Sequence, residues 1–332
     1  MNDPRSESAL LVAAQGGDEQ AFVRLTGTHR QALHVHCYRM LGSLHDADDA
    51  LQETLLRAWR GIGRFEPRAP LAAWLYRIAT NVCLRLIEQR DRRSAALVDA
   101  HLEPYPDGLI EEVRSGDPGP EAAVEERESI GLAFVAAMQL LPPKQRVAVV
   151  LRDALGWSAR EVADLLEDSV PAVNSALQRG RQRLERERRE GILGRTHAPV
   201  DARTEERVMR RFQDAWAAVD VESLVALLAD DALMTMPPEA ARFEGSAQIG
   251  AFFASVPRDG QLDRIRLVPT RANGQPALAA YALDDDGISR AYGVMVFALD
   301  GDRISCITGF PQQPELFTRL GLPTELDADD AY

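Results

Sequence analysis

Apolar residues recur at helical spacing through most of the chain and alternate with polar residues near its end. The helical spacing is clearest at residues 18–43, 46–62 and 71–93. Between residues 262 and 310 the period falls to two, and the turn sequences ANGQ, DDDG and LDGDR divide this stretch into three or four predicted strands. Helices followed by a long antiparallel sheet predict helical modules ahead of a domain of the α+β class.

Breaks in the helical spacing divide the chain into parts. Pro67 and Pro70 interrupt the first helical stretch, and residues 94–120 combine acids, prolines and glycines without periodicity. A predicted helix pair at 205–220 and 221–231 opens the α+β part. The sequence therefore predicts a helical module at 8–93, a flexible acidic linker at 94–120, a second helical module at 121–192 and an α+β domain at 203–320.

A chain of 332 residues, 45% hydrophobic and 27% charged, is expected to form two or three soluble domains. Its apolar runs are shorter than the roughly 20 residues that cross a bilayer, and its acidic start differs from a secretory signal. We therefore expect a cytoplasmic protein that makes no membrane contact.

The cysteines give little sign of a metal or disulfide framework. Cys37, Cys83 and Cys306 lie far apart and lack paired metal-ligand spacing, which favours buried thiols. His34 and His36 lie close to Cys37, but residues two apart on a helix point in different directions. We expect neither a metal site nor another cofactor.

The net charge of −13 is unevenly distributed. Residues 1–200 hold 26 basic and 29 acidic side chains, whereas residues 201–332 hold 12 and 22. Nine arginines gather at residues 57–93 and seven at 179–195, with three acids in each stretch, and an acidic strip at 99–128 separates them. Two basic islands on an acidic chain indicate two separate nucleic-acid contacts.

The second basic island lies at the end of two short predicted helices, at 158–166 and 169–184. Ser158 and Ser169 are typical N-cap residues. Short helices joined in this way predict a helix-turn-helix, whose second helix enters the major groove of DNA. The alternative is an ordinary helical hairpin with a solvated arginine face, and Gly180 is unfavourable within the second helix.

The second helix of this pair has an apolar face and a polar face. Val173, Ala176 and Leu177 are predicted to turn inward. Asn and Gln can read adenine, and Arg can read guanine or contact phosphate. The predicted DNA-contacting residues, of which the last two suit phosphates, are Asn174, Ser175, Gln178, Arg179, Arg181 and Arg183.

Two motifs narrow the choice among helix-turn-helix proteins. The first joins HCYRMLGSLHDADDALQETLLRAWRGIGRF to LAAWLYRIATNVCL, and the second is LPPKQRVAVVLRDALGWSAREVADLLEDSVPAVNSALQRGRQRL. Over about residues 8–190 the chain resembles the extracytoplasmic-function (ECF) sigma factors, which belong to the sigma-70 family of RNA polymerase subunits. The resemblance implies that 8–93 is sigma region 2, that 121–192 is sigma region 4, and that core RNA polymerase and promoter DNA are the partners.

The resemblance also implies roles for residues of the first module. DADDALQETLLRAW is similar to the helix that docks on the clamp helices of the largest polymerase subunit, which implies a polymerase-binding face of Asp46, Asp49, Gln52, Glu53 and Arg57. A merely solvated face is the alternative. GRFEPRAP and LAAWLYRIATN resemble the loop and helix that capture an unstacked base of the promoter −10 element. The implied residues are Trp74, Tyr76, Arg77 and Asn81, although Trp74 and Tyr76 are equally suited to a core.

In the second module, VPAVNSALQR resembles the helix that reads the promoter −35 element. This implies that Asn174, Ser175, Gln178 and Arg179 read bases. The acidic linker would thread through the polymerase channel used by nucleic acid, with its carboxylates in place of phosphates.

Residues 203–320 resemble the SnoaL-like polyketide cyclases, which implies a cone-shaped α+β domain with a pocket for a small apolar ligand. The candidate lining residues, which alternatively fill the core, are Met234, Met236, Phe243, Phe252, Phe253, Tyr281, Tyr292, Met295 and Phe310. All six histidines precede residue 201, so the pocket lacks the side chain best suited to proton transfer. We expect a regulatory domain rather than an enzyme.

Three functions remain open from the sequence. The first is a sigma factor whose C-terminal domain activates or restrains it. The second is a stand-alone helix-turn-helix regulator with a ligand-sensing domain, and the third is a cyclase-type or isomerase-type enzyme fused to a DNA-binding arm. An inhibitor protein is a further partner that the sequence neither requires nor excludes.

Overall fold

The computed structural model describes residues 4–67, 70–91, 102–111, 131–189, 200–239 and 241–327. The chain divides into two compact units: the first comprises residues 1–96, 109–117 and 137–184, and the second comprises residues 97–108, 118–136 and 185–332. Most of the predicted acidic linker, at 94–101 and 112–120, lies outside the described residues, as does the end of the second helical module at 190–192. Among the described helices, none is both long and apolar enough to cross a membrane.

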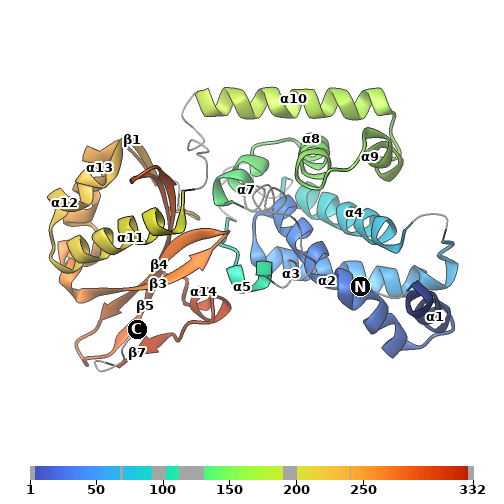
Figure 1. The fold of residues 1–332 in the computed structure, drawn as a ribbon, viewed down its shortest axis with the longest axis horizontal. Helices are drawn as coiled ribbons and strands as arrows, with labels where there is room; N and C mark the ends of the chain where they lie inside the picture. The colour runs from blue at the N-terminus through green and yellow to red at the C-terminus, as the bar shows by residue number, and fades with distance from the viewer. Residues whose placement is uncertain are drawn as a thin grey trace. The chain divides into compact units, whose positions relative to one another are not determined.

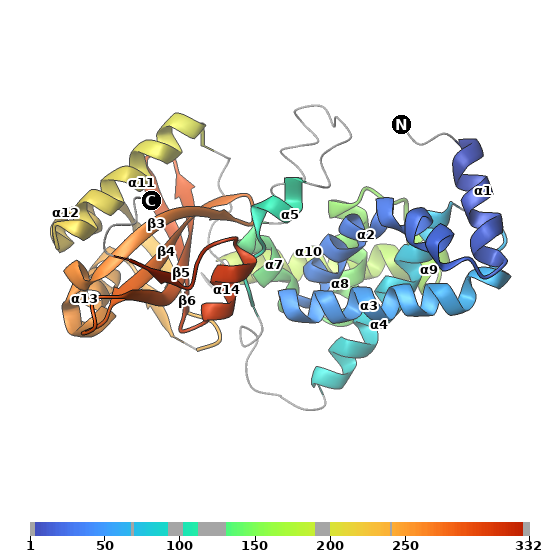
Figure 2. The ribbon, with the colours of Figure 1, turned by 90° about the horizontal axis from the view of Figure 1, so that it is seen from below.

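The first unit begins with a helical bundle, seen in Figure 2. Its helices are α1 (Pro4–Gln15), α2 (Glu19–Leu41), α3 (Leu44–Gly61) and α4 (Leu71–Asp91), with the short 3-10 turn η1 (Ile62–Arg64) after α3. Helix α3 begins two residues before the periodic stretch that the sequence shows at 46–62. Ser43 is its N-cap and accepts from the Asp46 backbone N–H at 3.1 Å, whereas the Asp46 carboxylate pairs with Arg90.

The helices of the second module follow α7 (Leu132–Gln139), which joins the two units in sequence. They are α8 (Pro143–Val149), the π-helical turn η3 (Val150–Ala154), α9 (Ala159–Leu166) and α10 (Val170–Arg189). Figure 1 labels the three α-helices. The predicted helix-turn-helix is therefore confirmed as α9 and α10.

The second unit contains the α+β domain, in which helices precede and flank a mixed sheet. Its helices are α11 (Ala202–Ala217), α12 (Val221–Ala226), α13 (Ser246–Ser255) and α14 (Pro314–Arg319), with short 3-10 turns at η4 (Pro257–Gly260) and η5 (Leu262–Arg264). Its strands are β1 (Leu228–Thr235), β2 (Arg242–Glu244), β3 (Ile265–Ala272), β4 (Gln275–Leu283), β5 (Ser289–Asp300), β6 (Arg303–Pro311) and β7 (Glu325–Leu326).

The sheet order is β2-β1-β6-β5-β4-β3, and β7 pairs with β5. The four strands from β3 to β6 confirm the period-two stretch, and β3 and β4 meet at the predicted Asn273–Gly274 turn, where both φ angles are positive. One boundary is wrong: the helix expected at 221–231 ends at Ala226. Residues from Leu228 onward instead pair in parallel with β6.

The core of this domain lies between one sheet face and the helices α11, α12 and α13, which Figure 1 shows together beside the sheet. The rings of Phe212, Trp216, Phe253 and Phe297 meet there with centroids 5.1–6.0 Å apart. The indole N–H of Trp216 donates to the Ile265 carbonyl at 3.0 Å. Aromatic packing therefore fills the space that the sheet encloses at this point.

Residues 102–111 depart from the expectation of a flexible linker. They include a short helix, α5 (Asp107–Glu111), and Pro106 forms an isolated bridge to Ala272 at the end of β3. The Tyr105 side chain is fully buried. We call residues 102–107 the docked segment, because they pack on the β3–β4 hairpin within the second unit.

Candidate nucleic-acid interface

Helix α10 presents the polar face that the sequence predicts. Asn174, Gln178 and Arg179 are exposed, and Ser175 beside them is half-buried and accepts from Arg179 Nη1 at 2.5 Å. Three apolar side chains of the same helix are buried, as expected: Val173, Ala176 and Leu177. The structure thus leaves two amides and a guanidinium side by side on an exposed helix near its N-terminal end, a pattern suited to base edges.

Each of the two helices has a side-chain cap at its N-terminus. Ser158 Oγ accepts from the Glu161 N–H at 3.2 Å, and Glu161 Oε2 accepts from the Ser158 N–H at 2.7 Å, which completes a capping box. These bonds lower the pKa of the Glu161 carboxyl. Ser169 Oγ accepts from the Ala172 N–H at 3.3 Å at the start of α10. Glu167, between the helices, has a positive φ of 54° that turns the chain.

The predicted phosphate contacts differ in their surroundings. Arg181 forms a two-point ion pair with Asp153, with Nη2–Oδ1 at 2.5 Å and Nε–Oδ2 at 3.1 Å, and this pair raises the pKa of the guanidinium. Arg183 is half-buried. Arg181 therefore has to exchange Asp153 for a phosphate if it is to contact DNA.

The predicted −10 residues lie along α4. Trp74 packs on Phe65 with ring centroids 4.9 Å apart and is half-buried, whereas Asn81 is exposed. Tyr76 is half-buried between two rings, His36 at 5.1 Å and Trp157 at 5.5 Å, both in edge-on geometry.

Arg77 pairs with Glu167, which lies in the turn of the helix-turn-helix. Two of the four predicted −10 residues, Tyr76 and Arg77, are thus in contact with residues of the second helical module.

The His36 side chain of α2 contacts α4. Its Nε2 lies 2.9 Å from Thr80 Oγ1, and its side chain is fully buried. Burial and then the nearby Arg39 charge lower the pKa of His36 to about 3, so the ring is neutral at ordinary pH. His34 instead contacts Asp48 at 3.0 Å. Among the described residues, no three His, Cys, Asp or Glu side chains are grouped as metal ligands.

The predicted polymerase-binding face lies along α3. Asp49 and Gln52 are exposed, and Glu53 and Arg57 form an ion pair at 2.6 Å one helical turn apart. Asp46 is turned toward Arg90 of α4 and is the least available of the five.

The candidate pocket residues are divided between the two faces of the sheet. Met234, Phe252, Phe253 and Met295 are buried in the core cluster; Met236, Phe243 and Tyr292 pack against that cluster. Tyr281 instead packs on Phe317 of α14, with centroids 5.0 Å apart. The position of a Cβ on Gly309 lies beside Met234 and Met236, so strand alternation puts the next residue, Phe310, on the opposite face.

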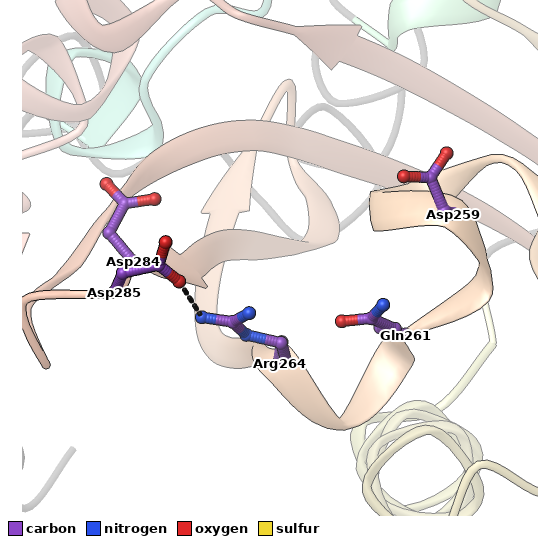
Figure 3. A pocket seen from close by; sticks show the side chains of 5 residues that line it. All are labelled: Asp259, Gln261, Arg264, Asp284 and Asp285. Atoms are coloured by element: carbon purple, nitrogen blue, oxygen red, sulfur yellow. Dashed lines mark hydrogen bonds and ion pairs between the residues drawn. The ribbon is translucent and has the colours of Figure 1, made fainter.

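A polar cleft of about 400 Å³ lies elsewhere on this domain. Figure 3 shows the side chains that line it. Its lining residues are Asp259, Gln261, Arg264, Asp284 and Asp285. Arg264 pairs with Asp285 at 3.1 Å. None of the candidate pocket residues lines this cleft.

Sequence reasoning missed two groups of residues. Arg146 of α8 is only 5% exposed and donates to the carbonyls of Met40 at 2.6 Å and of Gln139 at 3.1 Å. Tyr105 and Asp107 of the docked segment form the second group. The signal for that group was an aromatic residue between two prolines in an otherwise acidic stretch.

Comparisons with known proteins agree with this arrangement. The chain matches Sigma-70 region 2 over residues 25–93, Sigma-70, region 4 over residues 131–184 and the SnoaL-like domain over residues 209–307. The ECF RNA polymerase sigma factor SigG of Mycobacterium tuberculosis is 38% identical in an alignment of 339 positions that spans 95% of this chain and 89% of SigG.

Two further relatives are similar over part of the chain or in fold. SigW of Bacillus subtilis, also an ECF RNA polymerase sigma factor, is 31% identical over 176 residues, which are 52% of this chain and 92% of SigW. The crystal structure of the Mycobacterium tuberculosis extracytoplasmic function sigma factor SigJ matches 89% of this chain and 97% of its own, with a TM-score of 0.63 at 22% identity, and so shares the fold. With two sigma modules, a SnoaL-like domain and a relative similar along nearly its whole length, this chain belongs to the ECF sigma factors of RNA polymerase.

Proposed function

We propose that this sigma factor directs core RNA polymerase to promoters through two reading surfaces, α4 at the −10 element and α10 at the −35 element. The observation that carries the proposal is the exposed face of Asn174, Gln178 and Arg179 on a doubly capped helix-turn-helix. Amides and guanidinium groups discriminate base edges by paired hydrogen bonds. The α3 face of Asp49, Gln52, Glu53 and Arg57 binds the polymerase, and the protein acts in the cytoplasm, where the polymerase is.

The full-length similarity to a sigma factor argues against the two rival functions, a stand-alone regulator and an enzyme. The C-terminal domain has a regulatory role in this proposal. Its aromatic core and the absence of histidine beyond residue 201 fit such a role better than catalysis.

The regulation acts through the docked segment. The Tyr105 N–H donates to Asn273 Oδ1 at 2.8 Å, and the Asn273 N–H donates to the Tyr105 carbonyl at 2.7 Å. Asp107 accepts from the Gly274 N–H at 2.7 Å and from Arg271 Nε at 3.2 Å. The β3–β4 turn therefore grips both the backbone and a carboxylate of the segment.

The hydrogen bonds that hold the docked segment on the C-terminal domain compete with its binding to the polymerase. The docked segment belongs to the stretch that joins regions 2 and 4, for which the family resemblance implies a path through the nucleic-acid channel. A segment with Tyr105 buried and its backbone bonded to the C-terminal domain is not free to follow that path. The C-terminal domain thus restrains the sigma factor until the segment is released.

The test is in vitro transcription with core polymerase and the full chain on sheared genomic DNA, with the 5′ ends of transcripts sequenced. The double variant Asn273→Gly, Asp107→Ala removes three acceptor atoms of the grip, while glycine tolerates the positive φ of position 273. Asp302→Gly, in the exposed β5–β6 turn, is the matched control.

We expect the double variant to yield several-fold more transcript from the same promoters as the wild type, and the control to match the wild type. Equal or lower output from a correctly folded double variant would contradict restraint by the docked segment. Transcripts without a shared upstream sequence would contradict promoter reading itself.

A further inference from the structure

Regions 2 and 4 touch each other within the first unit, and the contact surface includes predicted reading residues. On the region 2 side lie Tyr76 and Arg77 of α4; on the region 4 side lie Trp157, just before α9, and Glu167, just after it. The Tyr76 and Trp157 rings are 5.5 Å apart at 69°, the edge-on geometry that aromatic pairs favour. The Glu167 carboxylate pairs with the Arg77 guanidinium.

A second part of the contact is buried. Arg146 of α8 donates to the Met40 carbonyl near the end of α2 at 2.6 Å, and also to both the carbonyl and the side-chain oxygen of Gln139. The acceptor that region 2 supplies is a backbone oxygen, which water can replace when the two regions separate. The contact is therefore one that a stronger competitor can open without leaving a buried charge unpaired.

The chemistry of the contact imitates that of the predicted ligand. The Glu167 carboxylate pairs with the Arg77 guanidinium, where a DNA phosphate or base edge would bind. The Trp157 indole packs edge-on against the Tyr76 ring, where a base would stack. The −35 face of α10 is not involved, because Asn174 and Gln178 remain exposed.

We propose that the turn of the helix-turn-helix masks the −10 reading residues Tyr76 and Arg77 in the free chain, and that this mask opens when the sigma factor enters the polymerase. The inference rests on the proposed −10 role of these two residues. Trp157 and Glu167 lie outside both predicted DNA-reading faces, and the proposed mask gives these two residues a function. It also differs from the docked segment, which involves only residues of the second unit.

The mask is tested on the full chain with two variants, Trp157→Ala and Glu167→Gln, and their combination. Lys144→Ala is the matched control, because it breaks the 3.2 Å ion pair to Asp168 in the same turn without touching region 2. The first readout is hydroxyl-radical labelling of Tyr76 followed by mass spectrometry. The second is the affinity for a fluorescent single-stranded oligo(dT), which cannot pair with itself, measured by anisotropy.

We expect the mask variants, but not the control, to raise Tyr76 labelling. Loss of an aromatic pair raises the open fraction about 2- to 10-fold, and the apparent affinity for the single strand rises by the same factor. The gain should vanish when Tyr76→Ala is added to Trp157→Ala. Circular dichroism and thermal unfolding verify that each variant is folded.

The outcomes separate the two proposals. If folded mask variants leave Tyr76 labelling at the wild-type level, the mask is overturned. If labelling rises but the gain in single-strand affinity persists without Tyr76, the mask stands and the −10 role of Tyr76 fails. Labelling of Tyr76 in the complex with core polymerase, without DNA, should equal or exceed that of the open variants, and protection below the free wild type counts against opening.

Discussion

A Cβ atom added to Gly180 of α10 would lie 2.9 Å from Cγ2 of Val149 in α8. Real Cβ atoms do not approach a carbon this closely, so the absence of a side chain at position 180 lets α10 cross α8. Val149 is buried and its β-branched side chain has little rotameric freedom with which to yield. The glycine that is unfavourable by helix propensity is therefore required by packing.

Gly180→Ala should destabilise region 4, although alanine is the better helix former. Overpacking costs about 1–3 kcal/mol, against a gain of about 1 kcal/mol in helix propensity, which leaves a net loss of up to about 2 kcal/mol. Hydrogen exchange of the α8 and α10 amides measures the change. In the background Val149→Ala, the same substitution should be neutral or stabilising, and an equal loss in both backgrounds would refute the close crossing.

Substitution of the α10 face should change promoter choice. Asn174→Ala or Arg179→Ala removes a side chain suited to paired hydrogen bonds with a base, at about 1–3 kcal/mol each. Transcripts sequenced from genomic DNA should show relaxed preference at one or two positions of the −35 element. Asp164→Ala, on the exposed side of α9, serves as the control, and an unaltered preference in both α10 variants would refute the assigned face.

Acidification should weaken region 2 through His36. The pKa of His36 is about 3 in the folded protein against 6.5 for an unperturbed ring, so below pH 6.5 only the unfolded state takes up the proton. The contribution of neutral His36 to the free energy of unfolding is complete above pH 6.5 and is lost as pH falls. The free energy of unfolding therefore drops by about 1.4 kcal/mol between pH 7.5 and 5.5. His29, whose pKa burial also lowers, adds in the same direction.

Hydrogen exchange of the most protected α2 and α4 amides, corrected for intrinsic rates, measures this loss. The variant His36→Gln retains His29 and should show a smaller difference between pH 7.5 and 5.5 than the wild type does. An identical difference in the two proteins would show that His36 does not carry the pH dependence.

Phe212→Ala should destabilise the C-terminal domain strongly. Phe212 is fully buried and contacts the rings of Trp216, Phe253 and Phe297, so truncation leaves a cavity at the centre of the core. The expected loss is about 3–5 kcal/mol, measured by thermal unfolding. The exposed Val219→Ala is the control, and comparable losses in the two variants would contradict the central place of Phe212.

Local patterns in the sequence were sufficient to predict the helices and the turns between strands. Ser158 and Ser169 marked two helix starts, and Asn273–Gly274 marked the β3–β4 turn, because capping and positive φ depend on a few neighbouring residues. At the start of α3, Ser43 and Asp46 were both suitable caps by type. The choice of Ser43 became visible only with the backbone, since Asp46 is engaged by Arg90.

Contacts between distant segments were beyond such patterns. The burial of Tyr105 depends on a hairpin far along the chain, and the buried Arg146 depends on a carbonyl of another module. The candidate pocket residues all have side chains suited to an apolar pocket. However, Tyr281 and Phe310 lie on the opposite face of the sheet from the other candidates. Side-chain type sets what a residue can bind, whereas topology sets what lies beside it.

The docked segment and the turn that holds it are 168 residues apart between Tyr105 and Asn273. A ribosome that adds 5–20 residues per second makes the second partner roughly 10–30 s after the first. Each newly made molecule thus passes through an interval in which both DNA-binding modules exist and the hairpin does not. Translation speed over the last half of the message sets how long every nascent copy exists before the turn that holds the docked segment is made.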